Sequence, residues 1–292
     1  MLKSSQVLDK RNPAADGPAY SCKSMADTED PLIRAGERGV PLTLQVSDCE
    51  LPQFMALAAN FGTQGYAYAV TPNVDHLIRF CDDASFRELY RSASFVLLDS
   101  RFLAYVLRMV AGLRLPTSPG SDVTARLFGE VIAPDDKVVV IGGTDEQAAM
   151  LSRRYGLMAL RHLNPPMGFI KDAAAVEECL RFVESESPFR FCLLAVGCPQ
   201  QEMLARALQT RGRARGLALC VGASINFLTG VERRAPAWMQ NVGLEWLYRL
   251  LNDPGRLAGR YLVRGPRIFL LLPRLKFQLR PAVPPVPDTP RP

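Results

Sequence analysis

Short apolar runs alternate with amphipathic stretches through most of this chain, and this alternation limits the fold more than any other feature of the sequence. The runs are typical of buried strands, and the stretches between them have the spacing of helices that bury one face. Such alternation favours a mostly parallel sheet with helices on both faces, so the sequence predicts a Rossmann-like α/β domain. Strands are expected at residues 42–46, 66–70, 95–98, 137–141, 157–162, 191–196 and 217–221, and helices at 51–60, 74–90 (one or two), 102–111, 121–132, 146–155, 173–185 and 200–210.

Composition changes at both ends of this predicted domain, which we assign to residues 40–253. Residues 1–39 mix Ser, Asp, Lys, Pro and Gly without periodicity, which is typical of a disordered leader. Residues 254–280 are expected to form a basic helical appendage that Gly265 and Pro266 divide into two short segments. Residues 281–292 contain six prolines and predict a disordered tail.

Positive charge is concentrated near the C-terminal end. Between Arg211 and Arg280, thirteen basic residues face three acidic ones, a net charge of +10, whereas the whole chain carries +6. Such a segment indicates an anionic partner, which can be a phosphate-bearing substrate, a lipid headgroup or a nucleic acid. The arginines follow an enzyme-like α/β pattern without a recognisable nucleic-acid-binding motif, so we expect no nucleic-acid partner.

Cysteine and histidine usage argues against disulfides and metals. The seven cysteines are an odd number without a CxxC pair, and several lie in apolar runs, which fits a reducing cytoplasm. The chain has only two histidines and no DxD carboxylate motif, so neither a zinc site nor a metal bound to a nucleotide diphosphate is expected. No cofactor is expected either, because the GxGxxG fingerprint and the Walker A lysine are missing.

No segment has the length of a membrane span. The N-terminus lacks an apolar signal core, and the longest late apolar run, Ile268 to Leu272, is far shorter than the roughly 20 residues that cross a bilayer.

Polar residues follow several predicted strands, where ligands of parallel sheets bind. Asp99 ends a buried run, and it is either the cap of the next helix or a general base whose pKa burial raises. Asn73 can cap the helix from Val74, face a sugar, or do both. Gly142 and Gly143 let the backbone approach a phosphate, or they form a tight turn.

The two histidines are read differently. His76 is expected to be a packed or surface residue of a helix, whereas His162 precedes a Pro- and Gly-containing loop and could approach a ligand.

The C-terminal half contains a specific set of motifs. Residues 222–227 (GASINF) are followed by Gly230, by residues 234–236 (RAP), by residues 244–250 (LEWLYRL), and by Arg256 and Arg260-Tyr261. This set resembles the C-terminal signature of the WecG/TagA/CpsF family of bacterial glycosyltransferases. Earlier pieces match in the same order, and the resemblance covers about Leu42 to Tyr261. These pieces are Thr71-x-Asn73, the strand ending in Asp99, residues 120–122, Gly142-Gly143 and Gly197-x-Pro199-x-Gln201-Glu202.

The resemblance implies a hexosyltransferase-type enzyme. Family members move a sugar from a UDP-sugar to a polyprenyl-diphosphate-linked acceptor at the inner face of the cell membrane, with inversion and without a metal. Mapped by motif, Asp99 is the candidate base, and Thr71 and Asn73 line the pocket beside it. Gln201 and Glu202 contact the nucleotide-sugar. The family's C-terminal appendage closes over the site and brings positive charge to the diphosphate. In this chain the matching residues are Arg234, Arg249, Arg256 and Arg260.

Several positions depart from the family pattern. Ser100 stands where the family has Gly, Gln200 where it has Lys, and Asn226 where Asp is frequent. The base is retained, so the departures concern the donor, which is left open between a hexose and an N-acetylhexosamine for exopolysaccharide, capsule or another surface polysaccharide.

Other functions and partners are weighed beside this one. A non-catalytic scaffold of a polysaccharide assembly complex is the alternative, since it would keep the fold and the basic tail without needing Asp99. The basic and apolar residues after Pro254 suggest docking on an anionic membrane surface. Self-association into a homo-oligomer is also expected from the family.

Overall fold

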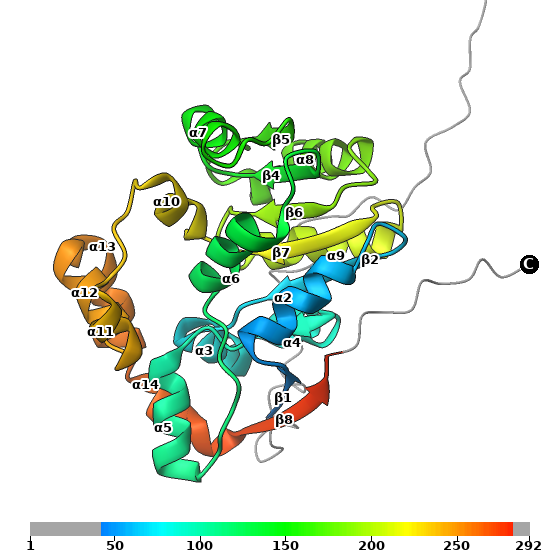
Figure 1. Cartoon of the computed structure of the whole chain (residues 1–292). Coiled ribbons are helices and arrows are strands. Elements are labelled where there is room, and N and C mark those ends of the chain that lie inside the picture. The colour runs from blue at the N-terminus through cyan, green and yellow to red at the C-terminus, as the bar shows by residue number, and fades with distance from the viewer. Residues whose placement is uncertain (1–41, 283–292) are drawn as a thin grey trace, which may run out of the picture.

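The computed structural model describes residues 42–282. A six-stranded, wholly parallel sheet with the order β3-β2-β7-β6-β4-β5 forms its centre (Figure 1). The predicted leader (1–39) and all but the first two residues of the predicted tail lie outside the described residues. The strands are β2 (Tyr66–Val70), β3 (Phe95–Val96), β4 (Lys137–Ile141), β5 (Ala159–Leu163), β6 (Phe191–Leu194) and β7 (Gly216–Cys220).

Helices cover both faces of this sheet, which confirms the predicted α/β architecture. Alternate strand residues enter two separate cores: Tyr68 and Val70 belong to one, and Ala67 and Ala69 to the other. Strands buried on both sides in this way read as continuous apolar runs. The helices are α2 (Leu51–Asn60), α3 (Val74–Asp82), α4 (Ala84–Arg91), α5 (Arg101–Ala111), α6 (Gly120–Arg126) with the π-turn η2 (Leu127–Val131), α7 (Asp145–Tyr155), η3 (Phe169–Lys171), α8 (Ala173–Ser185), α9 (Gln200–Arg211) and α10 (Ser224–Thr229).

The first strand does not join this sheet. The sequence pattern places residues 42–46 with the other strands, but β1 (Leu42–Asp48) pairs in parallel with β8 (Leu275–Pro281) in a separate two-stranded sheet. Leu44 and Val46 of β1 and Leu275 of β8 are buried, so this small sheet packs on one side of the larger core. The predicted helical appendage therefore ends in a strand, in which Leu275, Phe277 and Leu279 alternate with polar residues.

Short helices connect β7 to β8. A turn at Gly265-Pro266 separates two helical segments, as the sequence predicts. The second segment packs on α3 through the buried side chains of Ile268 and Leu271, which belong to the main core. The elements are α11 (Ala237–Asn241), α12 (Glu245–Asn252), α13 (Pro254–Ala258), η4 (Gly259–Arg264), α14 (Arg267–Leu271) and η5 (Leu272–Arg274).

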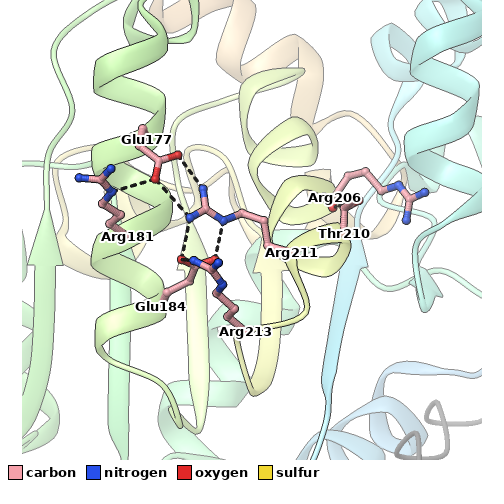
Figure 2. Close-up of polar contacts among 7 residues, drawn as sticks. All are labelled: Glu177, Arg181, Glu184, Arg206, Thr210, Arg211 and Arg213. Atoms are coloured by element: carbon pink, nitrogen blue, oxygen red, sulfur yellow. Dashed lines mark hydrogen bonds and ion pairs between the residues drawn. The ribbon is translucent and has the colours of Figure 1, made fainter. Parts of the chain in front are cut away.

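A charged network on the outer surface joins α8 to α9 (Figure 2). Arg211 on α9 places Nη1 2.6 Å from Glu177 Oε2 and Nε 2.7 Å from Glu184 Oε1, both on α8. Arg211 lies at the end of α9, so these pairs hold that end of the helix on α8. The first turn of the same helix lies at the carboxyl ends of the strands. Part of the positive charge counted in the C-terminal half is thus neutralised by carboxylates of the protein itself.

Among the helices of residues 42–282, none combines the length and the apolar character that a bilayer span requires.

Candidate active site

Apart from the C-terminal arginines, the residues expected to form the site follow strands of the main sheet. Thr71 and Asn73 come after β2, and Asp99 after β3. Gly142 and Gly143 follow β4, and Gln201 and Glu202 begin α9 after β6. The strands are parallel, so these segments lie at one edge of the sheet.

Asp99 is held between the ends of β2 and β3 and the start of α6. Its backbone N–H donates to the Pro72 carbonyl at 2.9 Å, and its Oδ1 accepts from the Gly120 N–H at 2.6 Å. The cap of α5 is Ser100, whose hydroxyl accepts from Leu103 N–H at 3.1 Å. The carboxyl is therefore not used as the cap of the helix that follows it, which was the alternative that the sequence left open.

Burial raises the pKa of Asp99 to about 6, although part of its surface stays exposed. The Gly120 N–H opposes this rise, Glu245 adds to it, and Arg249 lowers the pKa again. A carboxyl with such a pKa is ionised near neutral pH and remains basic enough to accept a proton.

Thr71 and Asn73 are tied into the protein backbone. The Thr71 hydroxyl is buried and donates to the Cys220 carbonyl at 3.1 Å, which links β2 to β7. Asn73 Oδ1 accepts from the N–H groups of Asp75 and His76 and so caps α3, as one of the two readings of the sequence required. The same oxygen accepts from Arg260 Nη2 at 3.3 Å, which brings the C-terminal segment to this edge.

Gly142 and Gly143 form a tight turn into α7. Both have positive φ, of 95° and 81°, and a Cβ at Gly142 would lie 2.8 Å from the Ala195 carbonyl oxygen. The next residue, Thr144, and Gln147 form a capping box, which uses the first backbone donors of α7. The tight-turn reading thus explains both glycines from contacts within the chain.

His162 is also satisfied within the protein. Its Nδ1 lies 3.0 Å from Asp145 Oδ1, and its Nε2 lies 3.1 Å from the Gly142 carbonyl oxygen. Both ring nitrogens therefore have partners without a ligand.

Gln201 and Glu202 lie beneath the surface, with 2% and 0% of their area exposed. Gln201 Oε1 accepts from the Gly222 N–H at 2.9 Å, and its Nε2 donates to Glu202 Oε1 at 2.9 Å. Burial raises the pKa of Glu202 to about 7, against the Gln201 hydrogen bond. In this arrangement the pair joins α9 to the loop after β7.

The C-terminal arginines are brought to the same edge by carboxylates. Arg234 Nη2 lies 2.7 Å from Asp122 Oδ1, and Arg101 Nη2 lies 2.7 Å from the other Asp122 oxygen. Asp122 lies in the matched segment 120–122, and the signal that marks it is its position two residues after Gly120, at the start of a helix.

Glu232 and Asp75 hold the other arginines more loosely. Arg249 and Arg256 lie 3.6 and 3.8 Å from the two oxygens of Glu232, and Arg260 Nε lies 3.7 Å from Asp75 Oδ2. These distances are long for charge-assisted hydrogen bonds, so Glu232 and Asp75 bind the guanidinium groups loosely, whereas Asp253 holds Arg256 more firmly, with Nε 2.6 Å from Oδ2. No motif marks Glu232, which lies between Gly230 and residues 234–236.

The two tryptophans have different environments. Trp246 lies edge-on between Phe102 and Tyr261, with ring centroids 6.2 and 6.0 Å away, whereas Trp238 is 63% exposed. Trp246 therefore fastens α12 to α5 and to η4, next to Arg249 of the same helix.

Three metal-ligating side chains also meet near this edge. Atoms of His76, Cys198 and Glu202 that could bind a metal lie within 4.8 Å of one another. This group could not be predicted, because its members are spread over more than a hundred residues and form no spaced motif.

The fold and the site together define an α/β protein that carries Asp99, a carboxyl with a raised pKa, at its strand ends, and several arginines on the segment that follows the sheet. The model of the glycosyl transferase WecG/TagA/CpsF family matches residues 40–282, and the chain belongs to this family. It is therefore a glycosyltransferase of a family that acts in the biosynthesis of cell-surface polysaccharides. Among solved structures, it is similar to a glycosyltransferase (DUF1792) from Streptococcus sanguinis, at 13% identity and a TM-score of 0.42, over 69% of this chain and 93% of that chain.

Proposed function

We propose that this glycosyltransferase moves a hexose or an N-acetylhexosamine from a UDP-sugar to a saccharide linked to polyprenyl diphosphate, with inversion at the anomeric carbon. The observation that carries the proposal is the relation between Asp99 and Arg249. Asp99 is a carboxyl with its pKa raised to about 6, and Arg249 is close enough to lower that pKa. Asp99 can act as a base on the acceptor hydroxyl, and Arg249 can stabilise negative charge on the leaving group. Their position at the strand ends therefore suits a displacement in which charge moves from acceptor to leaving group.

The chemical step is a single displacement. Asp99 takes the proton of the acceptor hydroxyl, and the hydroxyl oxygen forms a bond to the anomeric carbon. The bond from that carbon to the diphosphate oxygen breaks, and UDP leaves with the electron pair. Attack on the face opposite the leaving group inverts the anomeric centre.

The arginines would stabilise the charge that develops on UDP. Arg249 and Arg256 share Glu232 at distances above 3.5 Å, so a diphosphate could replace this carboxylate as their partner. Guanidinium groups bind phosphate oxygens in pairs and carry their charge at every working pH. With these cations in place, no divalent metal is required at the diphosphate.

We propose that the reaction takes place at the inner face of the cell membrane. The protein would bind the surface of that membrane peripherally, through its anionic lipids. Support comes from exposed apolar side chains that lie beside basic ones between α13 and β8. Leu262, Val263, Phe269 and Leu270 are 58%, 72%, 51% and 79% exposed. Arg264 and Arg267 are exposed on the same stretch, and both kinds of side chain suit a headgroup region.

The experiment is transfer from a panel of radiolabelled UDP-sugars to a lipid extract that contains polyprenyl-diphosphate-linked saccharides, without added Mg²⁺ or Mn²⁺. We expect one donor to label the lipid, and Asp99→Asn to lower the rate by at least about 100-fold. Asp135→Asn, at an exposed turn, is the matched control and should keep the rate.

Two results would contradict the proposal. Undiminished labelling by Asp99→Asn removes Asp99 as the base. Absence of labelling from every donor, together with absence of UDP binding in calorimetry, favours a non-catalytic scaffold instead.

A further inference from the structure

His76, Cys198 and Glu202 come together from two parts of the sheet edge. His76 lies in the first turns of α3, after β2, whereas Cys198 and Glu202 lie between the end of β6 and the first turn of α9. Strand β7 separates β2 from β6 in the sheet, so the group bridges two loops that are not adjacent along the strand order. One ligand-type atom from each residue lies within 4.8 Å of the other two.

The carboxylate of this group lacks a partner that its position demands. Glu202 is fully buried, and its Oε1 accepts from Gln201 Nε2 at 2.9 Å. Its Oε2 has no nitrogen or oxygen partner within residues 42–282, and the side chain that lies against the carboxylate besides Gln201 is the thiol of Cys198, a weak donor. Buried polar atoms are nearly always paired, so a carboxylate oxygen whose neighbours are a thiol and an imidazole indicates a place for a further ligand.

A hydrogen bond at one ring nitrogen orients the imidazole of His76. His76 is buried, and its Nδ1 lies 3.0 Å from the hydroxyl of Tyr90, which is buried as well. This contact leaves Nε2 as the free nitrogen of the ring. Histidines that bind metals typically use one nitrogen for the metal and the other for such an outer hydrogen bond.

We propose that His76, Cys198 and Glu202 form a Zn²⁺ site. Nitrogen, sulfur and carboxylate oxygen are the three donor types that zinc accepts in proteins, and three protein ligands leave one position for water or another group. Mg²⁺ and Ca²⁺ are excluded by the thiolate and the imidazole, because these hard cations select oxygen ligands. The entry path is from the side of Cys198, which is partly exposed.

Charge balance favours a divalent cation at this place. If Cys198 releases its proton on binding the cation, the thiolate and the Glu202 carboxylate would together carry two negative charges, which Zn²⁺ would neutralise in a buried setting. Arg79 lies near both groups and opposes the cation, whereas Asp75 lies near Cys198 and offsets Arg79. His76 would bind as a neutral imidazole, and Arg260, Asp75 and Arg79 lie near its ring.

The metal would act as a structural clamp. The residues next to its ligands are part of the candidate active site: Asn73 begins the helix that carries His76, and Gln201 precedes Glu202. A clamp between the two loops would fix the spacing of these residues across β7. The inference goes beyond the proposed transfer, no step of which passes through the metal.

The test is direct metal binding by the full chain without sugar nucleotide or acceptor. The protein is freed of metal with a chelator, desalted and titrated with Co²⁺, whose bond to a thiolate gives a charge-transfer band in the near ultraviolet. We expect one Co²⁺ per chain with this band, and its displacement by one equivalent of Zn²⁺. A chromophoric chelator in competition then gives the Zn²⁺ affinity.

The variants separate this site from the other cysteines. Cys198→Ala should abolish the band and lower the Zn²⁺ affinity by about 100-fold, whereas Cys179→Ala, at a buried cysteine of α8, should leave both unchanged. Glu202→Gln should keep the band and weaken binding. Circular dichroism checks that each variant is folded, and Cys198→Ser serves as a second thiol-free variant.

A folded wild-type chain that gives no thiolate band overturns the site, and so does a band that persists in both Cys198 variants. These outcomes do not depend on transferase activity. A chain that binds Zn²⁺ but transfers no sugar contradicts only the proposed function, and an active chain without the band contradicts only the metal site.

Discussion

Arg234 holds a carboxylate oxygen of Asp122 at 2.7 Å, across 112 residues of sequence, and so fastens the segment after the sheet to the start of α6. The side chains are 26% and 16% exposed, and the second Asp122 oxygen binds Arg101 at 2.7 Å. One carboxylate thus joins three elements around the candidate site.

Loss of this carboxylate should destabilise the protein. Asp122→Ala leaves two arginines without their anion, and we expect the free energy of unfolding to fall by about 1–3 kcal/mol in urea denaturation. Glu130→Gln, in the exposed pair with Arg126, is the control and should leave the midpoint unchanged. Equal midpoints for Asp122→Ala and wild type would show that the bridge contributes nothing to stability.

The stability of the protein should depend on the charge of Asp99. Its folded pKa of about 6 lies above the usual Asp value of 3.8, so the unfolded chain releases this proton first and stability decreases as pH rises between these values. Asp99→Asn keeps an oxygen for the Gly120 N–H and removes the charge. We expect it to be more stable than wild type by roughly 1–3 kcal/mol at pH 8, with the difference vanishing below about pH 4. A difference independent of pH would contradict the raised pKa.

Transfer activity should have an acidic limb that reports the same group. Protonated Asp99 cannot accept the acceptor's proton, so kcat/KM should fall tenfold for each pH unit below about 6 and level off above it. Arg249→Lys keeps a positive charge at this position and serves as control, since its limb should move little. A rate that stays flat down to pH 5 would remove Asp99 from the rate equation.

Arg249 should matter more to the transition state than to folding. Arg249→Ala should lower kcat/KM on the order of 100-fold, because one cation that stabilises the leaving diphosphate is lost. Arg213→Ala is matched in charge, is 70% exposed, and contacts Glu184 only at 3.9 Å, so it should keep the rate. If both variants lose activity equally, general charge rather than position is the cause.

Gly142 should be replaceable only at high cost. An alanine Cβ would lie 2.8 Å from the Ala195 carbonyl oxygen, at a φ of 95°. We expect Gly142→Ala to lower the free energy of unfolding by roughly 1–3 kcal/mol. Gly129→Ala, where a Cβ meets nothing within 4 Å, should be neutral or slightly stabilising. Thermal melts of both variants and of the wild type are the measurement.

The sheet could be predicted because its information is local. Each apolar run, such as residues 137–141, lies next to the helix pattern that covers it, and both are visible within a short window. The pairing of β1 with β8 could not be predicted in this way, since its strands are separated by more than two hundred residues. Alternation in residues 275–279 gives a strand signal but names no partner.

The sequence was enough to predict where the site residues lie in the fold, but not which partners their side chains contact. Strand ends located Asp99 and Asn73, because parallel strands direct their following residues to one edge. The main contact of Gln201 could not be predicted, because it is the N–H of Gly222 in the loop after β7, a partner that the sequence around Gln201 does not indicate. The meeting of His76 with Cys198 likewise arises only when β2 and β6 take their places on either side of β7.

The β1–β8 pair has a mechanical consequence. The strands run in parallel through seven register pairs, so a pull between the start of β8 and the end of β1 loads the whole ladder in shear. Such a ladder shares the load among its hydrogen bonds, whereas strands pulled apart from one end would break bond by bond. If the segment before β8 is attached to a membrane, this clasp passes tension from lipid to the catalytic domain without opening the sheet that carries the site.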